Sequence, residues 1–278
     1  MSENNTQTFT QAQWLRAAAQ QPPMPQDLPG WIVDFVKDCR EGDIHEYLND
    51  SARIVPKQGP GGQPPRYSAV LILLGDLAEG GADEAGVASH KKASMLLTHR
   101  APTMRKHSGQ VAFPGGGRED QDAGPIETAL REANEETGLD PASVDVCAVM
   151  QPIYIDRSNF AVIPVLAYWR EPHPVYCASA ENDWVQPYPV AKLVDPARRF
   201  RVEYLGWSGP AWMIDDMVLW GFTGGVISAI LQRAGWEEPW DDAAAMDLFA
   251  TLQESSNGEA LGEMRQAFTH AGPDGGAP

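Results

Sequence analysis

The chain has 278 residues, enough for one large domain or one domain with extensions, and its 43% hydrophobic and 21% charged residues are typical of a soluble globular protein. No apolar run approaches the roughly 20 residues that cross a bilayer, and the polar N-terminus lacks the features of a secretory signal. A net charge of −17 repels nucleic acid and anionic membranes. We therefore expect a cytoplasmic protein with neither as a partner, which receives any anionic substrate through a local basic patch or metal ions.

Three cysteines, Cys39, Cys147 and Cys177, lie far apart and without a CxxC spacing. This argues against a disulfide framework and against a zinc site. Free cysteine behaves as a small hydrophobe, so ordinary reduced thiols are expected.

The first 66 residues are rich in glutamine, proline and glycine. They predict an N-terminal extension and linker (1–66), ordered only in part, with a short helix at 31–39 and linker composition at 58–66. The pattern changes at Tyr67, where we place the start of a domain at 67–252. Residues 253–278 are then a C-terminal tail, expected to be frayed over about its last 20 residues.

The domain opens with apolar segments of strand length. Residues 68–75 form a continuous apolar run, 94–99 a second, and 109–114 a short third that ends at three glycines. A long polar hairpin loop is expected at 75–93. Pro125 suits the first turn of a helix and Gly138 the position just past its end, which predicts a helix between them.

Strands and helices alternate in the second half. Residues 144–155 and 160–168 predict a strand pair joined across 156–159, and 184–193 and 200–205 are weaker candidates. Residues 217–234 predict a buried helix despite their glycines, and 243–252 predict one more. The pattern is α+β, with strands first and a helix inserted among them.

The helix that begins at Pro125 carries an acidic cluster. Glu132, Glu135 and Glu136 fall on one face about 100° wide, separate from an apolar stripe. Like charges at these spacings destabilise a helix by a few tenths of a kcal/mol per pair, and the negative end of the helix dipole adds to the cost. A solvated acidic face is one explanation. Binding of a hard cation by the carboxylates, with Mg²⁺ or Mn²⁺ the natural candidates, would remove the conflict.

Residues 117–139, GREDQDAGPIETALREANEETGL, resemble the Nudix box, the signature of hydrolases acting on nucleoside diphosphates linked to another group. The matching positions are Gly117, Arg131, Glu132, Glu135, Glu136, Gly138 and Leu139, with Ala133 in the first apolar slot. The early glutamate of the pattern is replaced by Ala123, with Asp122 just before it. Asp122 is therefore a candidate for an additional acid from a shifted position.

The resemblance implies an α/β/α sandwich with a mixed sheet between helices, and Mg²⁺ or Mn²⁺ as cofactor. It implies Glu132 and Glu136 as the firmest metal ligands, Glu135 as a third, and Arg131 as the residue that orients them. Carboxylates on a rigid helix suit this chemistry, because the cations they hold neutralise phosphate oxygens and activate the attacking water. Asp183 is the first candidate for a further acid of the site, and Glu181 is the second.

Residues 96–116, LLTHRAPTMRKHSGQVAFPGG, resemble a narrower signature found just upstream of the box in Nudix coenzyme A diphosphatases. The matching positions are Leu96, Leu97, Thr98, Arg100, Ala101, Arg105, Gly109, Phe113, Pro114, Gly115 and Gly116. Arg100, Arg105, Lys106 and His107 form the densest basic cluster of this acidic chain, and arginine suits phosphate oxygens. Gly115, Gly116 and Gly117 would let the backbone approach a phosphate closely.

We therefore expect a metal-dependent hydrolase that cleaves the diphosphate bond of coenzyme A or its derivatives to adenosine 3′,5′-bisphosphate and 4′-phosphopantetheine. A Nudix hydrolase of another dinucleotide or nucleotide sugar is the first alternative, and a non-catalytic nucleotide-binding module is the second. Trp207, Trp212 and Trp220 are expected in the core or in a substrate wall. The sequence is compatible with a homodimer, but it fixes neither the oligomeric state, the metal, the acyl preference nor the general base.

Overall fold

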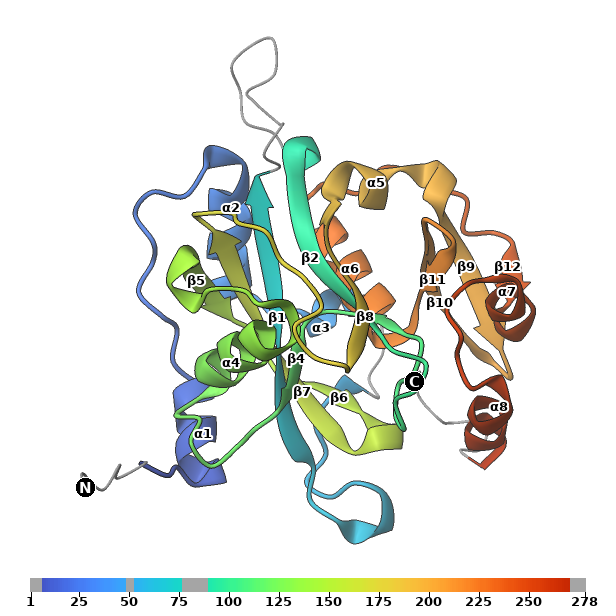
Figure 1. The fold of residues 1–278 in the computed structure, drawn as a ribbon, viewed down its shortest axis with the longest axis horizontal. Helices are drawn as coiled ribbons and strands as arrows, with labels where there is room; N and C mark the ends of the chain where they lie inside the picture. The colour runs from blue at the N-terminus through green and yellow to red at the C-terminus, as the bar shows by residue number, and fades with distance from the viewer. Residues whose placement is uncertain (1–6, 49–52, 77–89, 271–278) are drawn as a thin grey trace.

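The structure, a computed structural model, describes residues 7–48, 53–76 and 90–270 (Figure 1). The described helices are α1 (Gln11–Ala18), α2 (Gly30–Glu41), α3 (His45–Leu48), α4 (Pro125–Thr137), α5 (Val190–Val194), α6 (Gly221–Arg233), α7 (Leu248–Glu254) and α8 (Leu261–His270). No helix in this part of the chain has the length and apolar character needed to cross a membrane.

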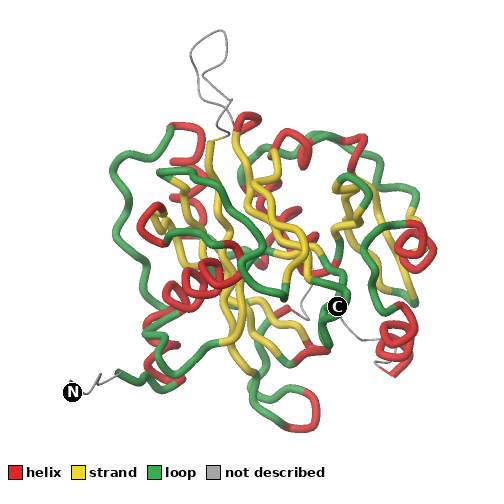
Figure 2. The backbone as a smooth tube through the Cα atoms, in the orientation of Figure 1, coloured by secondary structure: helices red, strands yellow, loops and turns green. Residues whose placement is uncertain are grey.

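The strands belong to a larger and a smaller sheet (Figure 2). The larger sheet contains β1 (Arg66–Asp76), β2 (Ala93–Arg100), β3 (Val111–Ala112), β4 (Gly115–Gly117), β5 (Val144–Val149), β6 (Ile153–Ile155), β7 (Phe160–Trp169) and β8 (Asn182–Pro189). The smaller sheet contains β9 (Arg199–Tyr204), β10 (Trp207–Ile214), β11 (Met217–Leu219) and β12 (Ala245–Asp247).

The larger sheet is mixed. Its strand order is β3-β2-β1-β7-β5, and β4, β6 and β8 pair with β1, β7 and β2 respectively. The long central strands β1 and β7 run parallel, whereas the other pairs in this sheet are antiparallel. β4 brings the glycines 115–117 beside the middle of the sheet, opposite Ser68 to Val70 of β1.

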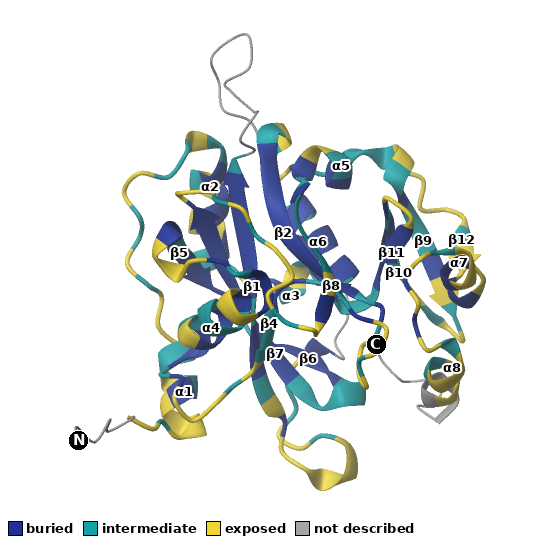
Figure 3. Ribbon diagram, in the orientation of Figure 1, coloured by how far each residue is buried: buried dark blue, intermediate teal, exposed yellow. Residues whose placement is uncertain are grey.

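Helices cover both faces of this sheet. Because side chains alternate along a strand, Leu71 and Leu73 of β1 pack with α4 and α1, while Ile72 and Leu74 pack with α2 and α6. The central strands are accordingly buried between the helices (Figure 3). This arrangement confirms the predicted α+β class, with a mixed sheet between two layers of helices.

The smaller sheet and α7 form a neighbouring unit with its own apolar cluster, which includes Val202, Trp220 and Phe249. α6 contacts β10 of this sheet and also packs on the larger sheet, so it joins the two units. Residues 101–110, between β2 and β3, lie where the two units meet.

Several predicted elements divide in the structure. The helix predicted at 217–234 was wrong at its start: Met217–Leu219 pairs with β10, and α6 begins only after Trp220, at Gly221, which has a φ of 65°. The strand predicted at 144–155 is two strands, β5 and β6. The segment 243–252 contains β12 before its helix. The glycines expected to end a strand at 114 instead form β4.

The N-terminal segment, expected to be ordered only in part, supplies α1 and α2 to the two helical layers, with Trp14 and Ile32 fully buried. α8 similarly occupies much of the tail expected to be frayed. The limits of the domain stay a prediction, and most of the hairpin loop expected at 75–93 lies outside the described residues. Cys39, Cys147 and Cys177 are free thiols, as expected, although Cys177 is exposed.

Candidate active site

The helix α4 forms where the sequence predicts it. Pro125 occupies its first turn, and Gly138, with a φ of 68°, accepts the left-handed conformation that ends it. Ala129 and Ala133 are fully buried against the sheet. Their small side chains let α4 lie close to β1 and β4, and the acidic face of the helix then lies against the glycines of β4.

The three glutamates of α4 differ in their surroundings. Glu136 is buried; its Oε2 accepts the N–H of Gly115 at 3.1 Å, and its Oε1 lies 3.5 Å from Nη1 of Arg100. Burial, only partly offset by this hydrogen bond and by Arg100, raises the pKa of Glu136 to about 7. Burial also raises the pKa of the half-buried Glu132, whereas Glu135 is exposed. The ionised forms of Glu132 and Glu136 would therefore be stabilised by a nearby cation.

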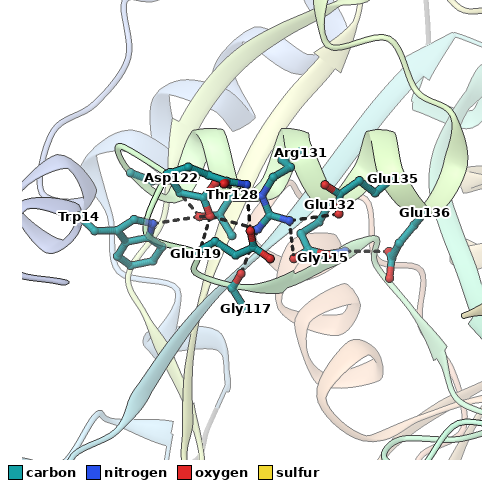
Figure 4. A network of polar contacts seen from close by, with 12 residues as sticks. Trp14, Gly115, Gly117, Glu119, Asp122, Thr128, Arg131, Glu132, Glu135 and Glu136 are labelled. Atoms are coloured by element: carbon teal, nitrogen blue, oxygen red, sulfur yellow. Dashed lines mark hydrogen bonds and ion pairs between the residues drawn. The ribbon is translucent and has the colours of Figure 1, made fainter. Parts of the chain in front are cut away.

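Arg131 links this cluster to the loop before the helix (Figure 4). Its Nη1 lies 3.0 Å from Oε1 of Glu132 and 3.2 Å from Oε2 of Glu135, and its Nη2 donates to the Gly117 carbonyl at 3.1 Å. Its Nε donates to Asp122 at 3.0 Å. Burial opposes the charge of Arg131, but these carboxylates outweigh it and raise the pKa of the guanidinium. Arg131 is thus held from both sides and fixes the positions of the two glutamates.

Asp122 lies on the far side of Arg131 from the glutamates and anchors it. This buried carboxylate accepts the backbone N–H of Glu119 and the hydroxyl of Thr128, each at 2.9 Å, besides its bonds to Arg131. Thr128 in turn accepts the indole N–H of Trp14 at 2.9 Å. Burial opposes ionisation, yet these donors lower the pKa of Asp122. Asp122 therefore supports the site from the loop instead of joining the acidic cluster.

The two downstream acids are placed differently from each other. Asp183 Oδ1 lies 2.5 Å from Nδ1 of His99, a buried residue of β2. Glu181 lies 3.4 Å from Nη2 of Arg100, and its charge contributes to the raised pKa of Glu132. Glu181, the second choice from sequence, is thus the acid that faces the α4 cluster.

A cavity of about 300 Å³ lies beside this cluster, on the side of Arg100 and the glycines of β4. Its lining includes Gly115–Gly117 of β4 and, from β2 and the following loop, Arg100, Lys106 and His107. Arg105 is exposed and is not part of the lining. The structure therefore brings most of the predicted substrate residues to one cavity beside the acidic helix, together with Lys106 of the basic cluster.

The opposite wall of the cavity comes from the start of α6. Trp220, Phe222 and Thr223 line it, whereas Trp212 is fully buried in the core. The sequence left these roles open because tryptophan suits both environments. The sequence did not predict that Trp14 and Thr128 support Asp122, because nothing in either local sequence shows that these residues, 114 positions apart, form a hydrogen bond.

The donor set of α4 suits a hard divalent cation, because Glu132, Glu135 and Glu136 offer only carboxylate oxygens. Gly116 lies so close to one of them that a Cβ there would be 2.4 Å from Cδ of Glu132. In their present positions, with Arg131 and Arg100 as partners, no three His, Cys, Asp or Glu side chains of the described residues form a metal-binding group. A cation would therefore take the place of some of these arginine contacts.

Comparison with known proteins places these features in a family. The model of the NUDIX domain matches residues 85–200. The uncharacterized Nudix hydrolase NudL of Cronobacter sakazakii is 35% identical over 157 residues, 55% of this chain and 81% of that protein. NudL of Escherichia coli K12 is 34% identical over 145 residues, 51% of this chain and 75% of that protein. The crystal structure of the Nudix hydrolase RenU of M. smegmatis aligns with 66% of this chain and 96% of its own, at 19% identity and a TM-score of 0.43.

Proposed function

We propose, because the chain belongs to the Nudix hydrolase family and is therefore a pyrophosphohydrolase, that it cleaves coenzyme A or one of its derivatives at the diphosphate bond. The products would be adenosine 3′,5′-bisphosphate and 4′-phosphopantetheine or its acyl form. Membership of this family favours the two enzymatic hypotheses, and nothing supports the alternative of a non-catalytic binding module.

One observation carries the choice of substrate. Residues 96–116 resemble the coenzyme A diphosphatase signature, and their cations Arg100 and Lys106 line the cavity next to the α4 glutamates, together with His107, whose pKa is lowered by burial. In a chain of net charge −17, a cluster of cations at this point is a local receptor for an anion. Coenzyme A carries a 3′-phosphate besides its diphosphate, which gives such a cluster a second group to bind.

In the proposed mechanism the α4 carboxylates hold the cofactor. Glu132 and Glu136 would be its main ligands and Glu135 a third. Arg131, anchored by Asp122 and the Gly117 carbonyl, would keep the contacts with Glu132 and Glu135 that the cation does not replace. A bound Mg²⁺ or Mn²⁺ supplies neutralisation of the phosphate oxygens and activation of the attacking water.

The remaining residues bind and orient the substrate. The backbone of Gly115–Gly117 borders the cavity without side chains, so a phosphate can approach it closely. Arg100 lines the same cavity and lies between Glu136 and Glu181, where its charge can be shared with a substrate phosphate. Lys106 and His107 would meet the 3′-phosphate. Arg105, which lies outside the cavity, would add positive charge to the same loop.

The test is a substrate panel with identified products. Purified protein with Mg²⁺ or Mn²⁺ is incubated with free and acylated coenzyme A, dephospho-coenzyme A, dinucleotides and nucleotide sugars, and the products are separated by chromatography. We expect the highest kcat/KM for coenzyme A or an acyl derivative, with adenosine 3′,5′-bisphosphate released. Intact coenzyme A in a preparation that cleaves another nucleotide would refute the substrate assignment and favour the other Nudix reading.

A further inference from the structure

A short segment after α7 connects the two walls of the cavity without lining it. This segment, residues 255–259, is here called the strap, and residues 101–110 are called the basic loop. The strap is attached to the smaller sheet, because the N–H of Ser256 donates to the carbonyl of Asp216, between β10 and β11, at 3.0 Å. The centre of the strap is Asn257, which is fully buried.

The side chain of Asn257 joins the basic loop to β11. Its Nδ2 donates to the carbonyl of Gly109 at 2.8 Å and to the carbonyl of Val218 at 3.0 Å, and its Oδ1 accepts the N–H of Val218 at 2.6 Å. One amide group therefore fixes the separation between the loop that carries Lys106 and His107 and the strand that leads directly into Trp220.

Two neighbouring contacts strengthen the same junction. The carbonyl of Asn257 lies 3.1 Å from Nε2 of His99, the last residue but one of β2. Glu259, also in the strap, accepts the indole N–H of Trp220 at 2.8 Å. The strap thus holds both Trp220, on one wall of the cavity, and the strand from which the basic loop departs.

The backbones of loop and strap are in direct contact. A Cβ on Gly109 would lie 2.3 Å from the carbonyl oxygen of Asn257 and 2.7 Å from the nitrogen of Glu259. Gly109 has a φ of 72° and His107 a φ of 54°, an unfavourable value for a non-glycine residue. A loop with this conformation needs outside contacts to keep it, and the strap provides them.

We propose that Asn257 is a positioning residue for substrate binding, which sets the width of the cavity by holding the basic loop against β11. Asn257 does not line the cavity and acts through the loop. The inference rests on the proposed role of the basic loop in binding the substrate, and it holds for whichever diphosphate the wild type cleaves best.

The test uses Asn257→Asp, which keeps the size and the acceptor but replaces the amide donor with an oxygen that faces two carbonyl groups. We expect KM for the best substrate of the panel to rise about tenfold, as for loss of one buried donor, with kcat within about threefold of wild type. Ser256→Ala, an exposed change in the same strap, is the control and leaves KM unchanged. A fall in thermal stability with an unchanged KM in the folded protein would overturn the proposal.

A double-mutant cycle separates positioning from a merely structural role. Lys106→Gln should raise KM in the wild-type background and change it by less than about twofold in the Asn257→Asp background, because the displaced loop no longer presents the lysine. If the two substitutions instead change KM independently, so that their effects multiply, the inference about Asn257 is overturned and the role of the basic loop is not. No effect of Lys106→Gln in the wild type would overturn the role of the loop and the inference with it. Gly109→Ala separates loop and strap from the loop side and should give the same change in KM if Asn257→Asp does not fold.

Discussion

Replacing the buried carboxylate of α4 by an amide should stabilise the protein without metal while removing its activity. Glu136→Gln mimics the protonated form of a side chain whose pKa burial raises from the ordinary 4.5 to about 7. Its oxygen can still accept the N–H of Gly115, which lies 3.1 Å from the carboxylate. The variant therefore removes the cost of a buried charge and, with it, the weaker attraction between Glu136 and Arg100.

The size of the effect follows from the raised pKa. The stability due to the neutral carboxyl is complete below about pH 4.5 and is lost as the pH rises through about 7, where Glu136 ionises in the folded protein. At pH 8, where Glu136 is mostly ionised, the folded protein is about 3 kcal/mol less stable than it would be with a side chain that stays neutral. For a chain of this size, Glu136→Gln should raise the Tm by about 5–10 °C at pH 8 in the presence of a chelator, and by little near pH 5.

The assay pairs thermal melts with turnover. Wild type and Glu136→Gln are melted at pH 5 and pH 8, each with chelator and with Mn²⁺, and hydrolysis is measured on the same samples. Mn²⁺ should raise the Tm of the wild type much more than that of the variant, because it binds the folded state through the carboxylate that the variant lacks. A variant that is less stable than wild type at pH 8 with chelator, or that retains turnover, would refute the reasoning.

Three further predictions concern the surroundings of α4. Gly116→Ala places a methyl group against the Glu132 carboxylate and should lower kcat about a hundredfold. The control Gly225→Ala, which has open space around its Cβ, should leave kcat unchanged. Equal kcat values for the two variants in a steady-state assay would contradict this prediction. Trp14→Phe keeps the buried ring but loses the bond to Thr128, so a denaturant melt should show a loss of about 1 kcal/mol, and an unchanged midpoint would show that the bond contributes nothing. Dialysis against chelator should abolish hydrolysis and added Mg²⁺ or Mn²⁺ should restore it; full activity after dialysis would exclude metal dependence.

Local signals predicted the helix α4 and the central strands well. The signals for α4, namely Pro125, Gly138 and the apolar stripe between them, all lie within the helix itself. The sequence therefore predicts the bounds of α4 to within a residue. The contact of Arg131 with Glu135 also follows from helical spacing, because the two residues are four positions apart.

Features that depend on distant contacts were not predictable in the same way. The apolar run from Met217 to Ala234 carries no sign that its first residues pair with β10, because the partner strand at 207–214 has no strong pattern of its own. The choice between Asp183 and Glu181 depends on which side of β8 and its preceding turn each side chain occupies. The position of Asp122 beside Arg131 depends on the fold of the loop at 117–124, where the chain departs from the box pattern.

The burial of Trp14 against α4 has a practical consequence for work on this protein. A chain shortened to begin at Tyr67, as the sequence pattern alone would suggest, loses the indole of Trp14, which packs on one face of the sheet. It also loses the α2 side chains Ile32, Phe35 and Val36, which cover the other face. Apolar surfaces on both faces of the sheet would then be exposed to water. Such a fragment should therefore be recovered as aggregates even though every glutamate of α4 is present.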